Sequence, residues 1–324
     1  MSDSPAIVAG RPALDWSGLL PIDKPLGMTS HDVVERVRRR LKAPHAGHLG
    51  TLDPGATGLL LVAIGAATRC SAVWQGGDKT YDATLLLGVV TDTQDLRGQA
   101  LERRDVRVDE AQVREASRAF VGDIRQVPPM VSALKVGGQR LYKLARRGEE
   151  VARVPRRIRV AAWEWLAFQL PRATFRVRCS SGTYVRTLAH DLGQALGCGA
   201  ALESLRRLRS EPYDVEQAPP LRLLDELPRE QVLADAGIPL DRALDVLPAV
   251  NLDAMAAENL GFGRQPAVAP GAVPVGAGPR SVVLRGPDGH ALALGELRPH
   301  PHDPMLALAC PHVVFPWAVR EGGE

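Results

Sequence analysis

The sequence has few of the features that mark secreted, membrane or metal-binding proteins. Its four cysteines, Cys70, Cys179, Cys198 and Cys310, lie far apart and form no C-x-x-C pair. This argues against a disulfide framework or zinc knuckle and predicts buried free thiols in a reducing compartment. The longest apolar run, 58–67, is shorter than the roughly 20 residues of a membrane span. The N-terminus lacks the apolar segment of a signal peptide. We therefore expect a cytoplasmic protein with no membrane contact.

Common cofactor motifs are also missing. The chain has no G-x-x-x-x-G-K-[ST] phosphate loop, no G-x-G-x-x-G after a strand and no G-x-S-x-G nucleophile elbow. His300 and His302 resemble a metal-ligand pair, but they lie among prolines with no third ligand nearby. We expect no metal and no cofactor, so that any reaction must use side chains alone.

Apolar periodicity predicts a mixture of helices and strands. Predicted strands cover 17–23, 59–64, 80–90, 157–170 and 174–179, and predicted helices begin at Thr29 or Ser30 and cover 108–120 and 183–196. These elements mix without strict β-α-β alternation, which favours an α+β fold with a mixed, largely antiparallel sheet.

The length of 324 residues allows about two domains of roughly 100–200 residues each. We expect a flexible N-terminal extension at 1–17 and a large catalytic domain at 18–247, within which 135–159 form a basic RNA-binding thumb region. Short apolar stretches broken by glycine and proline predict a small β-rich domain at 248–324.

Basic residues gather in one region of the chain. The net charge is only +3, but Lys135–Arg159 has nine basic residues and two acidic ones. The segment begins with a Gly137-Gly138 turn, and we expect a short helix to follow as far as Arg147. A basic block beside an acidic one suggests a bound polyanion such as RNA. The alternative is an arginine-rich surface that only keeps the protein soluble.

The stretch AGHLGTLDPGATG, residues 46–58, contains one acid, Asp53. Pro54 disfavours helical backbone at Asp53, and the surrounding glycines leave room for a flat ligand near the main chain. The stretch could therefore present one carboxylate to a planar ligand. D-P-G is also a common turn sequence, so an ordinary turn is the alternative interpretation.

A second stretch, RCSSGTYVRTLAHDLG, places Tyr184 and Arg186 between a predicted strand and a helix. An arginine that faces Asp53 would lower the pKa of that carboxylate and keep it ionised. Tyr184 could stack on a base. The alternatives are a surface arginine and a tyrosine packed in the core.

Six linked blocks resemble the TruB family of tRNA pseudouridine synthases. They are KPLGMTSHDVVERV, AGHLGTLDPGATGLL, DKTYDATLLLG with TDTQD, PPMVSALKVGGQRLYKLARRG, SSGTYVRTLAHDLG and ESLRRL. They occur in the order and at the spacing of the family, closely from about residue 18 to 212 and more loosely beyond. The resemblance implies the pseudouridine synthase fold, with a PUA-like C-terminal domain that touches the acceptor stem of tRNA.

The resemblance also implies roles for individual residues. Asp53 matches the catalytic aspartate and Arg186 the arginine that pairs with it. Residues matching the substrate-binding positions are His48, which enters the T loop, Tyr81, which stacks on the flipped base, and Tyr184 and Leu205, which line the same pocket. Matches to supporting positions are Lys24 and Pro25 in the first motif and Lys135, Lys143, Arg146 and Arg147 in a flexible thumb that closes over the RNA.

The implied reaction is the isomerisation of uridine 55 in the TΨC loop of tRNA, by base flipping and an aspartate nucleophile. It consumes no cofactor, and the expected partner is the T-arm of tRNA, bound by a monomer without a protein partner. Three alternatives stay open: a synthase with another RNA target, an RNA-binding folding helper, and a metal hydrolase that uses His48 and Asp53.

Overall fold

The computed structural model describes residues 16–132, 135–136, 139–140, 147, 151–271, 273 and 281–319. The predicted N-terminal extension therefore lies almost wholly outside the described residues, as do Lys143 and Arg146. Within the described part of the chain, no helix is long and apolar enough to cross a bilayer.

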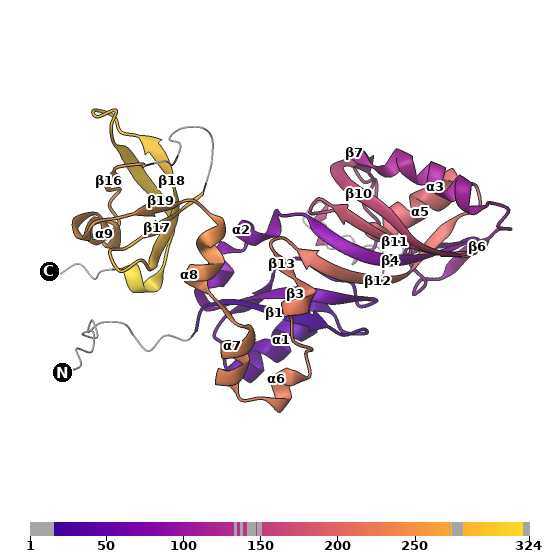
Figure 1. The fold of residues 1–324 in the computed structure, drawn as a ribbon, viewed down its shortest axis with the longest axis horizontal. Helices are drawn as coiled ribbons and strands as arrows, with labels where there is room; N and C mark the ends of the chain where they lie inside the picture. The colour runs from indigo at the N-terminus through magenta and orange to yellow at the C-terminus, as the bar shows by residue number, and fades with distance from the viewer. Residues whose placement is uncertain are drawn as a thin grey trace.

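A ten-stranded sheet forms the larger part of the molecule (Figure 1). Its main path runs β14 (Ile238–Pro239), β1 (Gly18–Lys24), β3 (Ala56–Ile64), β12 (Ala200–Ser210), β4 (Lys79–Leu87), β11 (Arg172–Cys179), β10 (Arg156–Gln169) and β7 (Gly122–Gln126). β2 (Ala46–His48) pairs with β3, and β13 (Tyr213–Asp214) pairs with β12. β3 and β12 run parallel, whereas the other described pairs in this sheet are antiparallel. The expected α+β class with a largely antiparallel sheet is confirmed.

The central strand β3 is buried on both faces, which explains its continuous apolar sequence. Leu60 and Val62 pack into one core with α1 (Ser30–Leu41), while Leu59 and Leu61 pack into a second core toward the C-terminal domain. α1 begins with a capping box between Thr29 and Asp32, as the sequence predicts, and its valines face the sheet.

The other half of the sheet, β4-β11-β10-β7, has one covered face and one face in contact with solvent. β4 alternates buried and half-buried residues along its length, the pattern of a strand with one face on a core. α3 (Glu110–Ser117) and α5 (Val185–Ala195) lie on the covered face, where Val113 and Leu188 join the core. We call the opposite face, exposed to water, the outer face.

The prediction of one continuous strand at 80–90 is wrong in one respect, because this segment forms two separate strands. Gly88 has a left-handed backbone with φ of +86°, so β4 ends at Leu87. The chain continues as β5 (Val89–Thr91), which pairs with β6 (Ala100–Arg103). The loop 92–99 between them returns the chain toward the functional site.

Short helical elements complete the larger part of the molecule. They are η1 (Gly65–Cys70), α2 (Ala72–Gln75), η2 (Arg118–Phe120), η3 (Val215–Gln217), α6 (Leu223–Glu226), α7 (Arg229–Ala236), α8 (Leu240–Ala243) and η4 (Leu244–Val246). In the basic block, β8 (Lys135–Val136) and β9 (Gln139–Arg140) pair across the predicted glycine turn. The expected helix up to Arg147 lies outside the described residues.

A separate five-stranded sheet follows from residue 249, as Figure 1 shows. Its order is β15 (Ala249–Asn251), β17 (Val282–Arg285), β18 (Ala291–Pro299), β19 (Ala307–Val314) and β16 (Ala267–Val268), with α9 (Ala254–Gly261) and η5 (Pro316–Ala318) beside it. Val283 and Phe315 of this domain share a core with Trp74 of the larger one. The predicted β-rich C-terminal domain is present, and its contact with the acceptor stem of tRNA stays a prediction.

Candidate active site

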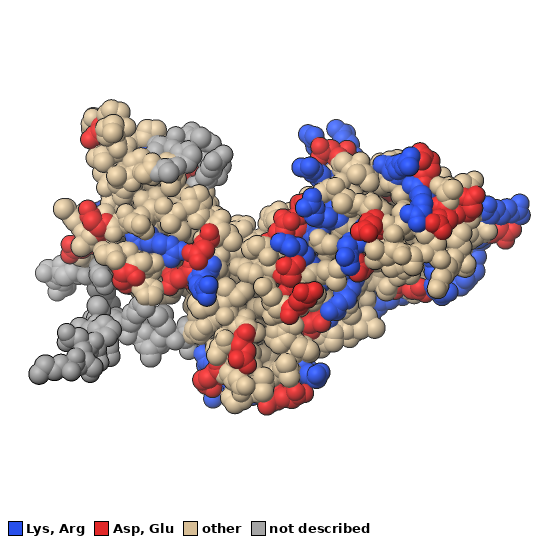
Figure 2. All heavy atoms as spheres, viewed as in Figure 1, with Lys and Arg blue, Asp and Glu red and all other residues tan. Residues whose placement is uncertain are grey.

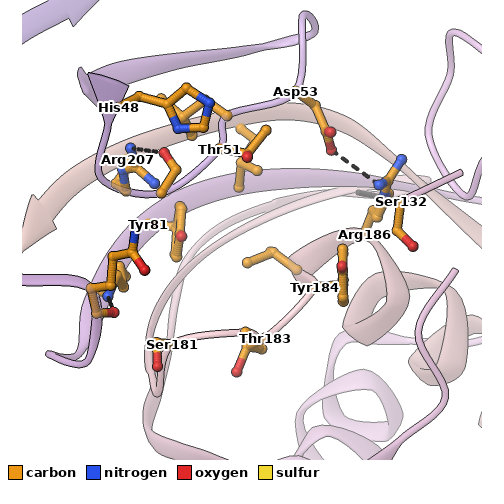
Figure 3. A pocket seen from close by; sticks show the side chains of 17 residues that line it. His48, Thr51, Asp53, Tyr81, Ser132, Ser181, Thr183, Tyr184, Arg186 and Arg207 are labelled. Carbon is orange, nitrogen blue, oxygen red and sulfur yellow. Dashed lines mark hydrogen bonds and ion pairs between the residues drawn. The ribbon is translucent and has the colours of Figure 1, made fainter. Parts of the chain in front are cut away.

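A cavity of about 510 Å³ opens beside the centre of the large sheet (Figure 3). Six residues predicted from the sequence line it together: Asp53, Arg186, His48, Tyr81, Tyr184 and Leu205. They come from segments far apart in the chain, and only folding brings them together. A volume of this size lies in the ordinary range for a small-molecule or nucleoside site.

Asp53 lies in a tight turn that ends at the start of β3. The backbone N–H of Ala56 donates to the carbonyl of Asp53 at 2.9 Å, so the D-P-G sequence does form a turn. The same turn points the carboxylate toward the cavity. The turn interpretation is therefore confirmed, and presentation of the carboxylate to a planar ligand stays a prediction.

The turn is held from behind by the segment that follows β1. The Nζ of Lys24 donates to the carbonyls of Pro25 and Met28, at 3.0 and 2.7 Å. The N–H of Gly27 then donates to the carbonyl of Pro54 at 2.8 Å. Lys24 is fully buried, and burial lowers its pKa to about 8 against the opposing effect of Asp53. Lys24 and Pro25 thus lie in a layer beneath the aspartate turn, outside the cavity lining.

Ser30 provides a second support. Its Oγ accepts from the N–H of Leu52 at 2.8 Å and donates to the carbonyl of the same residue at 3.0 Å. Ser30 is the first residue of α1, so the helix fixes the residue before Asp53.

Arg186 points at Asp53 from the start of α5 (Figure 3). Its Nη2 lies 3.4 Å from Oδ2 of Asp53, and its side chain is 5% exposed compared with 41% for the aspartate. The same Nη2 donates to the carbonyl of Val131 at 2.6 Å, and Nη1 lies 3.9 Å from Oδ2 of Asp95. A buried guanidinium therefore faces two carboxylates and one carbonyl.

The pKa of Asp53 is raised, not lowered as the sequence argument expected. Burial of the carboxyl is the largest cause, and the neighbouring carboxylate of Asp95 adds to it. Arg186 and Lys24 act in the opposite direction but do not outweigh these effects. Because Arg186 is shared with Asp95, its charge is not available to Asp53 alone. An ion pair with arginine alone would lower the pKa of Asp53, but burial of the carboxylate opposes this effect and is larger.

Tyr81 and Arg207 form the floor of the cavity on neighbouring strands. They are directly paired between β4 and β12, and both are buried. Arg207 donates from Nε to the carbonyl of Leu59 at 2.7 Å and from Nη2 to the carbonyl of Gly50 at 3.2 Å. Burial raises the pKa of the Tyr81 phenol, which therefore stays neutral near pH 7. Leu205 lies on the same face of β12, two residues before Arg207.

Tyr184 lies at the opposite wall, immediately before α5. Gln126 of β7 clamps its backbone, since the amide accepts from the N–H of Tyr184 at 2.9 Å and donates to its carbonyl at 3.0 Å. The guanidinium carbon of Arg186 lies 5.7 Å from the ring centre. The tyrosine ring is thereby placed beside the ion pair.

His48 of β2 lines the cavity at its other end. Among the described residues, no group of three or more metal-ligating side chains comes together. The metal hydrolase alternative therefore gains no support from the arrangement of His48 and Asp53. In the predicted thumb, the side chain of Lys135 lies outside the described residues, and Arg147 is exposed.

Arg207 and Asp95 are site residues that the sequence argument did not assign. Both occur in blocks quoted for the family resemblance, ESLRRL and TDTQD. The sequence did indicate where the side chain of Arg207 lies, because residues two apart on a strand share a face and Leu205 was already predicted to line the pocket. No comparable signal existed for Asp95, whose position depends on a loop held by contacts with β12 and α5.

The cavity therefore combines one carboxylate, that of Asp53, with two buried arginines and two tyrosines, and its volume is sufficient for a nucleoside. Residues 38–185 match the model of the TruB family pseudouridylate synthase N-terminal domain, and residues 186–245 match the tRNA pseudouridylate synthase B C-terminal domain. The chain belongs to the TruB family of pseudouridine synthases. It is a tRNA pseudouridine synthase, an isomerase that acts on uridine in tRNA.

Relatives and solved structures agree with this assignment. The tRNA pseudouridine synthase B of Geobacter sulfurreducens is 49% identical over 250 residues, covering 77% of this chain and 82% of its own. The protein of the same name from Opitutus terrae is also 49% identical, covering 68% and 92%. A Cbf5-Nop10-Gar1 complex contains a chain that is 28% identical with a TM-score of 0.70, covering 95% of this chain and 88% of its own. An H/ACA RNP bound to a substrate RNA containing 2'-deoxyuridine contains one that is 25% identical with a TM-score of 0.67, covering 96% and 94%.

Proposed function

We propose that this enzyme isomerises uridine 55 in the TΨC loop of tRNA, with Asp53 as the nucleophile. The observation that carries the proposal is the Asp53 carboxylate, 3.4 Å from the Arg186 guanidinium at the wall of a cavity of about 510 Å³. An aspartate nucleophile divides one difficult step into two easier ones.

The target uridine has to leave its loop to reach Asp53. Flipping a base costs a few kcal/mol, and stacking on an aromatic ring returns about 1–3 kcal/mol. Tyr81 supplies the ring, Tyr184 and Leu205 close the pocket around the base, and His48 enters the loop in place of the flipped nucleotide. All four residues line the cavity.

The reaction breaks the bond between N1 of uracil and C1′ of the ribose and forms a bond between C5 and C1′. The hydrogen on C5 leaves as a proton, and N1 gains one, so the product is an isomer of the substrate. Asp53 can make its first bond to C1′ or to C6, or it can remove a ribose proton to start a glycal route. Arg186 orients the carboxylate in each case.

The wider RNA interface involves further segments of the chain. We assign the thumb (Lys135, Lys143, Arg146 and Arg147) to closure over the T-arm and the C-terminal domain to contact with the acceptor stem. We expect a monomer that acts in the cytoplasm without a protein partner or cofactor.

A different RNA target is the second candidate, because similar solved structures include an H/ACA RNP bound to a substrate RNA. Identities of 49% to proteins named tRNA pseudouridine synthase B, compared with 25–28% to the H/ACA-type chains, favour tRNA.

The direct test incubates unmodified tRNA with the pure protein in the absence of cofactors and maps pseudouridine by chemical labelling and primer extension. We expect one new stop, at position 55. Modification elsewhere, with position 55 untouched, would contradict the proposed target. A protein that binds tRNA and forms no pseudouridine would favour the role of a folding helper.

A further inference from the structure

A second cavity, of about 380 Å³, adjoins the active site, and we call it the side cavity. Its lining comes from 26–27 after β1, 53–56 in the aspartate turn, 95–97 between β5 and β6, and 202–205 of β12. Asp53 and Leu205 line the side cavity and the active-site cavity alike. Asp53 therefore lies at the boundary between two cavities.

The walls of the side cavity are mainly aliphatic. Leu26 and Leu96 line it although they are 67% and 37% exposed, and Leu202 and Leu205 complete the apolar surface. No aromatic side chain occurs among the described residues that line it, in contrast to the two tyrosines of the active-site cavity. Walls of this kind suit contact with a sugar better than stacking with a base.

The loop that carries Leu96 and Arg97 is fixed by hydrogen bonds to its surroundings. The N–H of Leu96 donates to the carbonyl of Leu202 at 2.9 Å, and the N–H of Leu202 donates to the carbonyl of Gln94 at 3.0 Å. Within the loop, the N–H of Arg97 donates to Oδ1 of Asp95 at 3.0 Å. One wall of the side cavity is thus held in place by β12, and a site formed in advance loses less entropy on binding.

Of the described residues that line the side cavity, Arg97 is the one with a positive charge. Its side chain lies over the backbone of Gly55, since a Cβ placed on Gly55 would be 2.8 Å from Cδ and 3.5 Å from Nη1 of Arg97. Arg97 is exposed, and no carboxylate among the described residues lies within 4.0 Å of its guanidinium. Because Gly55 follows Asp53 by two residues, an unpaired positive charge lies beside the aspartate turn.

The charges around Arg97 are paired. Nε of Arg172 lies 2.9 Å from Oε2 of Glu203, which also lines the side cavity. Nη1 of Arg186 lies 3.9 Å from Oδ2 of Asp95. In Figure 2, basic and acidic side chains lie next to one another over β12, β4 and β11, which Figure 1 labels in the same view. The guanidinium of Arg97 differs from these groups because it is left without an anion.

We infer that Arg97 binds a phosphate that flanks the target uridine, and that the side cavity holds the adjoining sugar–phosphate backbone. With the base in the active-site cavity beside Tyr81, the ribose has to reach Asp53 at the boundary. The backbone attached to that ribose must then leave past Asp53, and the side cavity is the space on its other side. Arginine is suited to this role because its planar fork can bind phosphate through two hydrogen bonds.

This inference rests on the proposed function and adds a positioning residue to it. Arg97 touches the RNA backbone and not the reacting atoms. A phosphate anchored beside the aspartate turn fixes the ribose relative to the carboxylate of Asp53, which is the alignment that the reaction needs. The contact lies outside the active-site cavity and outside the thumb.

The test uses T-arm RNA hairpins in which a neutral methylphosphonate replaces one of the two phosphates flanking uridine 55. Dissociation constants are measured in the Asp53→Asn protein, so that neither turnover nor ionisation of the carboxylate affects binding. Arg97→Gln removes the proposed contact. Arg103→Gln is the matched control, because Arg103 is exposed on the same strand pair, opposite Val89 at the end of β6 away from the loop.

With Arg97 present, the methylphosphonate at one of the two linkages should weaken binding about tenfold, as expected for the loss of one charged hydrogen-bonded pair. Arg97→Gln should weaken binding of the all-phosphate hairpin by a similar factor and show no further loss with that methylphosphonate. Its slope of log affinity against log salt should fall by about 0.7. Arg97→Lys should keep most of the slope, and Arg103→Gln should behave like the Asp53→Asn parent with every hairpin.

The inference would be overturned if each methylphosphonate weakened binding equally with and without Arg97, because other groups would then hold the phosphate. The absence of any loss from either methylphosphonate in the parent would overturn it as well. Equal losses in Arg97→Gln and Arg103→Gln would reflect net charge alone and have the same consequence. Failure of the proposed function is read separately, from whether the wild-type protein modifies uridine 55 in tRNA.

Discussion

Replacing Arg186 with lysine preserves the positive charge but removes the planar group that faces Asp53. The guanidinium of Arg186 spans three acceptors, at 3.4 Å from Asp53, 2.6 Å from the carbonyl of Val131 and 3.9 Å from Asp95. One ammonium group cannot hold all three. At least one charge-assisted contact is lost, and the carboxylate loses its fixed orientation.

The size of the effect follows from the geometry of the pair. A hydrogen bond to a charged group contributes about 1.5–3 kcal/mol. The Asp53 side chain is 41% exposed, so water screens the pair and a value near the lower end, about 2 kcal/mol, applies. Because about 1.4 kcal/mol corresponds to a tenfold change in rate, we expect Arg186→Lys to slow the chemical step roughly 30-fold.

The assay is single-turnover release of tritium from tRNA labelled at C5 of uridine, with enzyme in excess. Arg172→Lys is the matched control, because Arg172 also pairs with a carboxylate, Glu203, but on the outer face. The control should stay within twofold of wild type. An Arg186→Lys rate within threefold of wild type would refute the orienting role of the arginine.

Two further predictions follow from the supports of Asp53. Because the pKa of Asp53 is raised, kcat/KM should fall on acidification at a higher pH than for an ordinary carboxyl group, as the carboxylate gains a proton. We call this fall the acid limb of the pH profile. The charge of Arg97 lowers the pKa of Asp53, so Arg97→Gln should move the acid limb to higher pH. An acid limb that moves to lower pH in this variant would contradict the assignment of the limb to Asp53. Ser30→Ala leaves the buried N–H of Leu52 without its acceptor, which should cost about 1–3 kcal/mol and lower both the melting temperature and turnover. The control is Ser117→Ala, which removes the hydrogen-bond acceptor of Trp165 outside the cavity and should lower the melting temperature without lowering turnover. Equal turnover in the two serine variants would contradict the conclusion that Ser30 supports the aspartate turn.

Much of the fold could be predicted from the sequence because helix caps and apolar periodicity coincide with the residues that the structure buries. The valines of α1 and its Thr29 cap, and the alternating residues of β11, carry their periodicity in the sequence itself. The break at Gly88 was missed because an apolar run continues on both sides of it. A glycine inside a strand pattern indicates a bend only when its backbone angle is known.

The cavity residues were predicted through motif resemblance, whereas their energetics required the structure. Arg207 occurs in an arginine-rich strand that could equally well face water, and its burial depends on the parallel pairing of β12 with β3. The direction of the Asp53 pKa shift depends on how deeply its turn is packed and on the presence of Asp95. Neither quantity is encoded in a short stretch of residues.

The most direct test of the central claim is turnover by Asp53→Asn. Asparagine keeps the shape of the side chain but cannot act as a nucleophile, so the variant should bind unmodified tRNA with nearly wild-type affinity. Single-turnover formation of pseudouridine at position 55 should fall below about one percent of wild type, since the whole covalent route is lost. Tight binding without turnover would agree with the account, and turnover clearly above that level would contradict it.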